Sequence, residues 1–403
     1  MLNLNKDKVS TIIITAVITF LLTAGAGLIA LRKQGEFNVI VPSKYSKQLT
    51  KALVLRKQLE NKYVYKISDE KLFDGMYKGL VDSLNDPYTV YMNKKEIKSF
   101  MEDVQASYAG VGMMMSPDKK NDSIVVVVPF KGAPAYKAGI KPGDNILKVN
   151  GEKLTSKDMN KAISIMKGKV GKKVVMEVYR PSTKKTLNKV LYTENISIPT
   201  VDSKVKEGNI GYIRISQFAE KTAADFISQL DELKSKGIKG LIIDVRDNPG
   251  GYYDQVVEIC DALLPKATIV YTIDKYGHKE VESSDEEHKT NLPMAVLVNG
   301  QSASASEILS GALKDNKKAV LIGTRTFGKG LVQSTFPLSD GSATKITIAK
   351  YYTPSKVCIQ GKGIEPDIKS ALPDGKESTL DLTTKEKDTQ LDKALGYIEK
   401  KIK

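Results

Sequence analysis

The chain of 403 residues is poor in several residue types that carry protein chemistry: it has no tryptophan, two histidines and two cysteines. His278 and His288 both lie in the polar, charged stretch 274–291, which we expect to be a surface loop. A Ser-His-Asp triad needs a histidine held by a buried carboxylate, so the sequence disfavours that site. No helix carries two metal ligands at a useful spacing, and we predict neither a metal nor a cofactor.

The two cysteines do not have the spacing of a metal site. Cys260 lies on an apolar helical face that it shares with Val256, Val257 and Leu264, so we favour a buried free thiol. A disulfide between Cys260 and Cys358 stays open if the compartment is oxidising.

Positive charge exceeds negative charge, with 62 lysines and arginines against 47 acidic residues and a formal net charge of +15. Such an excess can indicate binding to nucleic acid or to an anionic membrane surface. The lysines are dispersed along the whole chain, however, and no basic stretch alternates with aromatic residues as a nucleic-acid groove requires. The sequence therefore predicts no nucleic-acid partner.

One long apolar run lies near the N-terminus, where residues 9–31 contain no charged side chain. About 20 such residues cross a bilayer as a helix. A cleaved signal peptide is the alternative, because Ala24-Gly25-Ala26 resembles a cleavage site. The run is longer than the apolar h-region of a normal signal peptide, so we expect a short tail, residues 1–8, and an uncleaved transmembrane anchor, residues 9–31. We expect a single-pass protein of the cell membrane, with the remaining chain on the extracytoplasmic side.

The remaining chain divides by its periodicity into a helical region and an α/β region. Residues 43 to about 100 show helical spacing with a turn at 85–88, and residues 32–95 are expected to be a helical region that packs on the core. From residue 208 strands and helices alternate, which predicts an α/β core with a mixed sheet and flanking helices over residues 196–375. The expected core strands are 210–215, 240–245, 294–298 and 319–322, and the expected core helices are 223–236, 253–264 and 304–314.

Residues 376–403 are expected to form a C-terminal amphipathic helix, lysine-rich from Thr384. Leu391, Leu395 and Ile398 lie on one face of this helix. That face can pack on the core or on another subunit, which leaves a homodimer open.

Residues 133–151 carry the motif Ala-Pro-Ala-x-x-Ala-Gly-Ile-x-Pro-Gly-Asp-x-Ile-x-x-Val-Asn-Gly. This motif closely resembles the bacterial PDZ signature, and the resemblance covers about residues 96–185. It implies an α+β domain that binds a peptide's C-terminus as an added strand, with the terminal carboxylate held by backbone N–H groups. The expected loop consists of Gly110, Val111 and Gly112; an ordinary glycine turn without a ligand is the alternative.

Two glycine-containing segments place a strand end before a helix start: Asp-Val-Arg-Asp-Asn-Pro-Gly-Gly at 244–251 and Val-Asn-Gly-Gln-Ser-Ala-Ser-Ala-Ser-Glu at 298–307. Helix N-termini favour anionic charge. Taken alone, Ser304 and Glu307 form a capping-box pattern, and Ser302 is an equal candidate for the cap. Lys329 is unusual because it lies between two glycines. If its segment is extended, Lys329, Leu331 and Gln333 share one face.

Together these segments resemble the C-terminal processing peptidases, also called tail-specific proteases. The resemblance covers nearly the whole chain from Tyr45, and the pairing of Ser-Ala-Ser-Ala-Ser-Glu with Thr-Phe-Gly-Lys-Gly-x-Val-Gln is specific. It implies an α/β protease core with an inserted PDZ-like domain. It also implies Ser304 as nucleophile, Lys329 as general base and Gln333 as the residue that orients the lysine. Asp315 is a secondary candidate, although an aspartate that simply ends a helix is the simpler interpretation.

A lysine base imposes a physical requirement, because a free lysine has a pKa near 10.4 and work near pH 7–8 requires a pKa about three pH units lower, or roughly 4 kcal/mol. Desolvation can supply this change. Ser304 would then form an acyl-enzyme. The N–H groups of Ala305 and of Gly250 or Gly251 would hold the oxyanion.

Two other classes of protein compete with the predicted peptidase. A penicillin-binding type of acyltransferase lacks its Ser-Asp-Asn and Lys-Thr-Gly partners here. A membrane-tethered PDZ adaptor with an idle catalytic site is the other, and the presence of Ser304, Lys329 and Gln333 argues against it. The prediction is therefore a serine endopeptidase that recognises protein or peptide substrates by their free C-terminal tails and cleaves near them.

Overall fold

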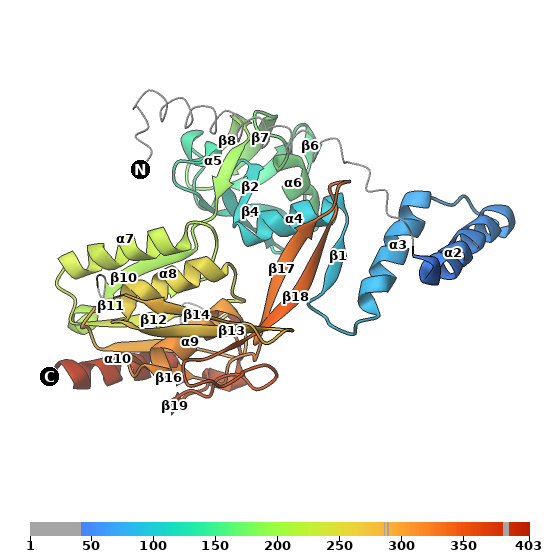
Figure 1. Cartoon of the computed structure of the whole chain (residues 1–403). Coiled ribbons are helices and arrows are strands. Elements are labelled where there is room, and N and C mark those ends of the chain that lie inside the picture. The colour runs from blue at the N-terminus through green and yellow to red at the C-terminus, as the bar shows by residue number, and fades with distance from the viewer. Residues whose placement is uncertain (1–41, 286, 288–289, 382–386) are drawn as a thin grey trace, which may run out of the picture. The chain divides into compact units, whose positions relative to one another are not determined.

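A computed structural model of the chain describes residues 42–285, 287, 290–381 and 387–403 (Figure 1). The predicted tail, the predicted anchor and His288 lie outside these residues. None of the helices among the described residues is long and apolar enough to cross a membrane. The described residues fall into two compact units, residues 42–94 with Thr335–Lys345, and Lys95–Ser334 with Ile346–Lys403.

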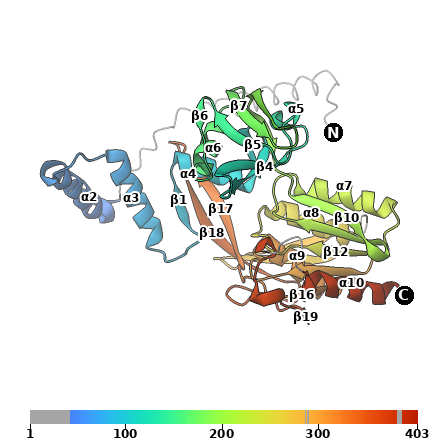
Figure 2. The same cartoon turned by 180° about the vertical axis from the view of Figure 1, so that it is seen from behind.

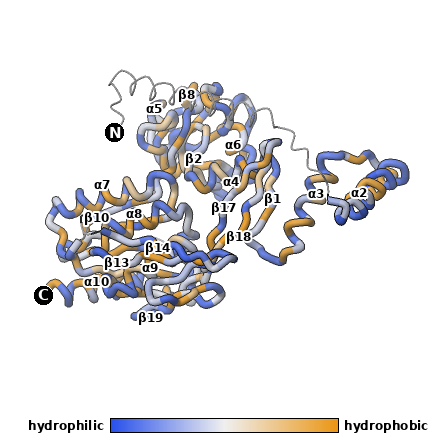
Figure 3. Tube along the Cα trace, in the orientation of Figure 1, coloured by the Kyte–Doolittle hydropathy of each residue, from blue (hydrophilic) through white to orange (hydrophobic). Residues whose placement is uncertain are grey.

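Among its described residues, the first unit contains two helices, one short strand and the ends of two longer strands. The hydroxyl of Ser68 accepts from the N–H of Lys71 at the start of the second helix, as serine often does at this position. Neither helix has a buried residue, and Figure 3 shows apolar segments along both. The prediction of helix to about residue 100 is wrong at the strand, which pairs antiparallel with the start of β18. The bounds are α2 Ser43–Lys62, α3 Asp69–Asp82, β1 Val90–Met92 and β18 Ala343–Tyr352.

A six-stranded mixed sheet forms the centre of the second unit, in the order β10-β11-β12-β15-β16-β19. β10 pairs antiparallel with β11, and the other neighbours pair in parallel. A mixed sheet is what the alternation of the sequence predicts. The bounds are β10 Val201–Lys206, β11 Ile210–Ile215, β12 Gly240–Asp244, β15 Met294–Val298, β16 Ala319–Gly323 and β19 Ile368–Lys369, with a short 3-10 turn at Glu207–Asn209.

Helices cover both faces of this sheet (Figures 1 and 2). In β12, Leu241 and Ile243 pack with α7, α8 and α9, while Ile242 packs on the opposite face with α10. This is the alternation expected of a strand, and every residue of β12 and β15 is buried, as in parallel sheets covered on both sides. The bounds are α7 Thr222–Ser235, α8 Tyr253–Leu263, α9 Ala305–Asp315 and α10 Thr389–Ile402.

The C-terminal helix packs on the core, which is the first of the two arrangements that its sequence allows. Ile398 is fully buried against the sheet, and Leu391 and Leu395 pack around it. The segment before α10 contains two 3-10 turns, Pro373–Gly375 and Thr379–Asp381.

The PDZ-like domain contains an antiparallel sheet in the order β3-β4-β5-β7-β8, with β6 paired to β5 beside this path, and helices α4, α5 and α6. Its apolar core includes Ile124, Ile146 and Val178. β8 pairs with β7 along its whole length and lies beyond the predicted boundary at residue 185. The bounds are α4 Lys94–Val104, β2 Ser107–Gly110, β3 Met113–Asp118, β4 Ser123–Pro129, α5 Pro134–Lys137, β5 Asn145–Val149, β6 Glu152–Lys153, α6 Met159–Met166, β7 Lys173–Arg180, β8 Lys185–Tyr192 and β9 Glu194–Ser197.

The stretch 274–291 differs from its predicted loop, because part of it forms an antiparallel hairpin of β13 (Ala267–Asp274) and β14 (Lys279–Ser284). His278 lies in the turn of this hairpin with its side chain 78% exposed. β13 also pairs with β18, to which β17 (Leu331–Pro337) adds. Both cysteines are free, and Cys260 is buried, so the disulfide alternative is wrong.

Candidate active site

Ser304 lies at the N-cap of α9 with a strained backbone, φ +56° and ψ −114°. A non-glycine residue in this region is held there by its surroundings, and such strain gathers at functional sites. The neighbours Ala303 and Ala305 are buried, whereas Ser304 is partly exposed. The turn into the helix therefore presents this serine toward solvent.

The two serines beside Ser304 anchor the loop. The hydroxyl of Ser302 donates to the carbonyl of Val245 at 2.8 Å, and that of Ser306 donates to the carbonyl of Asn248 at 3.0 Å. Both side chains are fully buried. The sequence left Ser302 and Ser304 as equal candidates for the helix cap, and the structure assigns the cap to Ser304.

Gly250 lies directly against Ser304. A Cβ atom at Gly250 would be 2.8 Å from the Cβ of Ser304 and 3.0 Å from the amide nitrogen of Ala305, and its φ of +102° favours glycine. A Cβ at Gly251 would collide with the carbonyl of Phe218. Three residues that the sequence singles out, Gly250, Ser304 and Ala305, are thus brought together.

The backbone donors around Ser304 differ in how they are used. The N–H of Gly250 donates to Oδ1 of Asn248 at 2.8 Å. Within the part of the chain that the structure describes, the N–H groups of Gly251 and Ala305 have no acceptor. Asn248 is itself buried, and its side chain also donates to the carbonyl of Ile215.

Glu307 joins the segment of Ser304 to the segment of Lys329. Its Oε2 accepts from the N–H of Ser304 at 3.0 Å and from the N–H of Lys329 at 2.8 Å. Its Oε1 accepts from the N–H of Gly328 at 2.7 Å and from the hydroxyl of Thr326 at 2.6 Å. The two backbone nitrogens that share Oε2 lie within about 6 Å of each other, because each is at hydrogen-bond distance from the same atom.

The carboxyl group of Glu307 is fully buried. Burial raises its pKa above the ordinary value, and the hydrogen bonds from Thr326, Lys329, Gly328 and Ser304 oppose that rise. All four groups donate, so they match an ionised acceptor.

The glycines around Lys329 are explained by a second segment that packs against them. A Cβ at Gly328 would be 2.9 Å from the amide nitrogen of Gly363, and one at Gly330 would be 2.7 Å from that of Gln360. The N–H of Gly330 also donates to Oε1 of Gln360 at 2.9 Å. Lys329 is thus held from both sides, and it is partly buried.

Gln333 lies on β17, where its Nε2 is 3.5 Å from the hydroxyl of Thr347 on β18, at the limit of a hydrogen bond. Lys329 itself lies just before β17, which begins at Leu331, so its place on a face shared with Gln333 stays a prediction. The buried Tyr351, also on β18, donates from its hydroxyl to the carbonyl of Ser304 at 3.1 Å.

Asp315 is not brought to this site. It ends α9, and the rise of an α-helix places it about 16 Å from Ser304. Its carboxylate accepts from the N–H and the hydroxyl of Ser355. The structure thus agrees with the simpler interpretation, an aspartate that ends a helix.

A buried ion-pair network lies behind the turn of Gly250. Arg246 is 1% exposed and binds the carboxylates of Asp244 at 2.6 Å and Asp388 at 2.8 Å. Asp388 also caps α10 by accepting from the N–H of Leu391. The C-terminal helix is thereby tied to the strand that leads into the glycine turn.

The sequence did not reveal the roles of Glu307, Asn248, Tyr351 and Arg246. Glu307 was visible only as the last residue of a capping box, which accounts for one of its four hydrogen bonds. The other partners lie 19 to 22 residues away. The role of Glu307 could have been inferred from its place at the start of a helix that is expected to be buried. A carboxylate buried there requires several hydrogen-bond donors.

In the PDZ-like domain, Gly110 ends β2, and Val111 and Gly112 connect it to β3. The carbonyl of Val111 accepts from the N–H of Ala135, and the carbonyl of Gly112 accepts from the N–H of Phe130. Both carbonyls therefore point into the domain. Among the described residues, the N–H groups of Val111 and Gly112 have no acceptor.

Three family descriptions match parts of the chain. Residues 209–370 match Peptidase family S41, residues 125–180 match the PDZ domain, and residues 32–96 match the Activating protease CtpB N-terminal domain. The carboxy-terminal processing protease CtpA of Bacillus subtilis (strain 168) is 38% identical over 399 residues, which cover 96% of this chain and 83% of that protein. The chain belongs to peptidase family S41.

A second relative is the carboxy-terminal processing protease CtpB of Bacillus subtilis (strain 168), which is 42% identical over 320 residues, covering 78% of this chain and 66% of that protein. A solved structure described as an S41 protease from Bacteroides fragilis NCTC 9343 has a TM-score of 0.54 at 16% identity, covers 87% of this chain and 96% of its own, and shows the shared fold. This S41 member is a serine-type peptidase with a PDZ domain. Family membership thus favours an enzyme over an idle adaptor.

Proposed function

We propose that this peptidase cleaves protein substrates with Ser304 as nucleophile and Lys329 as general base. The observation that carries the proposal is the carboxylate of Glu307, which binds the backbone N–H groups of both residues through one oxygen. A neutral Lys329 would accept the proton of the Ser304 hydroxyl as its oxygen attacks the scissile carbonyl. The acyl-enzyme would then be released by water, with the same amine as base.

The developing oxyanion would be held by backbone N–H groups of Ala305 and Gly251. Neither N–H has another acceptor among the described residues, whereas the N–H of Gly250 already donates to Asn248. Gly250 would contribute by its lack of a side chain, which leaves room beside Ser304. Preorganised donors of this kind contribute about 2.7–4 kcal/mol each to transition-state stabilisation.

Gln333 would orient the Lys329 amine toward Ser304. Its position on β17, four residues after the lysine, supports this role. An amine held at a fixed distance and angle from the Ser304 hydroxyl spends more of its time in a reactive geometry. Replacing Gln333 by alanine should therefore lower kcat less than replacing Lys329.

The experiment compares two lysines that share the same local sequence. Lys329 and Lys362 each lie between two glycines, and Lys362 is exposed. Lys329→Ala should abolish turnover, and Lys329→Arg should fail almost as badly because a guanidinium stays protonated. Lys362→Ala should keep near-normal kcat. A Lys329→Ala protein that retains most of its activity would refute the dyad.

We further propose that the PDZ domain captures the free C-terminal tails of substrates. The N–H groups of Val111 and Gly112 support this, since they have no acceptor among the described residues and backbone N–H groups of this kind can bind a carboxylate. Cleavage of one peptide as the free acid and as the C-terminal amide tests it. Equal rates for the two forms would remove the claim.

The membrane anchor remains a proposal that rests on the uncharged run at residues 9–31. It predicts that the full-length chain fractionates with membranes and that added protease digests it from the extracytoplasmic side. Recovery of a soluble form that begins near Gly27 would indicate a cleaved signal peptide.

A homodimer is also proposed, with the helices of the first unit as the contact. Leu53 on α2 and Leu80 on α3 are 60% and 73% exposed, and apolar surface of this kind favours association. Sedimentation of the chain and of a Leu53→Glu, Leu80→Glu variant tests the proposal. A monomer at micromolar concentration for the unaltered chain would contradict it.

A further inference from the structure

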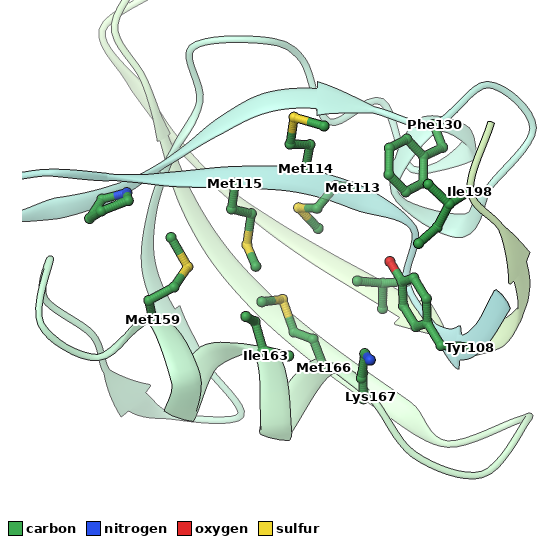
Figure 4. Close-up of a pocket in the computed structure, with 12 residues that line it drawn as sticks. Tyr108, Met113, Met114, Met115, Phe130, Met159, Ile163, Met166, Lys167 and Ile198 are labelled. Atoms are coloured by element: carbon green, nitrogen blue, oxygen red, sulfur yellow. The ribbon is translucent and has the colours of Figure 1, made fainter. Parts of the chain in front are cut away.

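A methionine-lined groove lies between β3 and α6 of the PDZ domain (Figure 4). Its volume is about 540 Å³, within the range of ligand-binding pockets. Five methionines line it, although the whole chain has 11. They are Met113, Met114, Met115, Met159 and Met166.

The two walls of the groove present their methionines to each other. In Figure 4, Met113 and Met115 point from β3 toward α6, and Met159 and Met166 point back from the helix. Met113 and Met166 are 7% and 3% exposed, so they form the floor of the groove. Met115 and Met159 are partly exposed and lie where an incoming side chain would first make contact.

The occupant that this groove fits is the C-terminal end of an extended peptide. β3 is the edge strand of its sheet, paired only with β4 among the described strands, so its other edge can add a strand. Lys167 lies at one end of the groove beside Tyr108, with its ammonium group 4.5 Å from the ring centre. That positive charge complements a terminal carboxylate, although Glu102, 3.5 Å from the ammonium, offsets part of it.

Methionine walls select side chains differently from walls of valine or isoleucine. The thioether chain is unbranched, has three rotatable bonds and can adjust to long side chains, and sulfur makes favourable contacts with aromatic rings. A short or β-branched side chain leaves part of such a groove unfilled, which forfeits dispersion contacts. The lining therefore carries specificity beyond simple apolarity.

We propose that this groove selects substrate tails that end in a long unbranched or aromatic side chain, in preference to tails that end in a β-branched or small one. The inference rests on the proposed tail recognition by the PDZ domain. It names the class of tail that the same site would accept.

The test uses the full chain with Ser304→Ala, so that bound peptides are not cleaved. Fluorescent peptides that differ only in the last residue, Phe, Met, Val or Ala, are titrated as free acids, with the Phe peptide also as its amide. The Phe and Met acids should bind about threefold to tenfold more tightly than the Val acid, as expected for sulfur–aromatic contacts and a filled groove. Equal affinity for the four acids would overturn the inference.

Variants locate the preference in the methionines. Met115→Ile and Met159→Ile replace flexible chains by stiff ones, and together they should reduce the preference to less than twofold. Met76→Ile on α3, which is 40% exposed and outside the groove, is the matched control and should leave the preference unchanged. Met115→Leu with Met159→Leu keeps an unbranched Cβ, so this double variant should retain part of the preference. It also shows whether any loss in the isoleucine variant comes from a folding defect.

The outcomes separate the two proposals. If the Phe acid binds and its amide does not, tail recognition holds, and side-chain preference is judged on its own. A preference that survives in Met115→Ile, Met159→Ile refutes the inference alone. If acid and amide bind equally, the proposed tail recognition fails and the inference fails with it.

Discussion

The substitution Glu307→Gln changes one buried group at the junction of the two proposed catalytic segments. The glutamate accepts four hydrogen bonds through its two oxygens, and Oε2 alone accepts from Ser304 and Lys329. A glutamine has the same shape but presents an NH2 group to one pair of donors. Two charge-assisted hydrogen bonds are then lost, each worth about 1.5–3 kcal/mol, so the variant should lose roughly 3–6 kcal/mol of stability.

The effect on activity should exceed the effect on folding. At 20 °C, where circular dichroism can verify the native state, kcat of Glu307→Gln should fall at least 100-fold. The NH2 group would face either the N–H groups of Ser304 and Lys329 or the donors of Thr326 and Gly328, and both orientations weaken the link between the two segments. KM should change less, since the proposed capture of substrate tails lies in the PDZ domain. Asp315→Asn, on the same helix but at its far end, is the control and should keep kcat within about threefold.

Protonation of Glu307 should lower kcat, as this substitution does, although its effect on folding stability has the opposite sign. Burial raises the pKa of Glu307, so the folded state takes up this proton at a higher pH than the unfolded chain. The free energy of unfolding therefore falls as the pH rises through the folded pKa and Glu307 ionises. The ionised form is nevertheless the one that can accept all four hydrogen bonds. The acid limb of kcat should lie above the ordinary glutamate pKa. A folded Glu307→Gln protein with more than a tenth of the normal kcat and an unchanged acid limb would refute the reasoning.

Three other predictions test the surroundings of the site. Gly250→Ala should lower kcat/KM about 100-fold, since its Cβ would press on Ser304 and Ala305, whereas Gly277→Ala has a similar positive φ in open space and should leave kinetics unchanged. Asp388→Asn should cost about 3 kcal/mol in urea unfolding by leaving Arg246 underpaired, against less than about 0.5 kcal/mol for the half-exposed Asp392→Asn. Burial opposes ionisation of Asp388, but the Arg246 hydrogen bond holds its pKa below the usual value. The stability that Asp388 contributes is therefore present at neutral pH and is lost as the pH falls through the folded pKa. A free energy of unfolding that differs between wild type and Asp388→Asn by the same amount at every acid pH would contradict this. Hydrogen peroxide, which oxidises a thioether to a sulfoxide and is reduced to water, should weaken tail binding several-fold, and protein with leucine at Met114, Met115 and Met159 should resist it.

The sequence by itself determined the elements whose signal is local. β11 and β15 have the predicted bounds, because short apolar runs between turns are typical of buried strands. The turns of the PDZ motif follow from glycines and prolines that only certain backbone conformations accept. The segments of Ser304 and Lys329 were found in the same way, by residue patterns that lie within a few positions of each other.

Only the tertiary structure decided which of these segments meet and what joins them. Arg246 and Asp388 are 142 residues apart in sequence, and nothing in either local pattern indicates the other. Glu307 looked like a helix cap, and its bonds to Thr326, Gly328 and Lys329 depend on where a distant loop folds back. The hairpin at 267–284 was hidden because its second strand is polar and lacks the alternation that identifies a half-buried strand. Periodicity reports burial along one element, whereas a buried polar group is satisfied by whichever donors packing delivers to it.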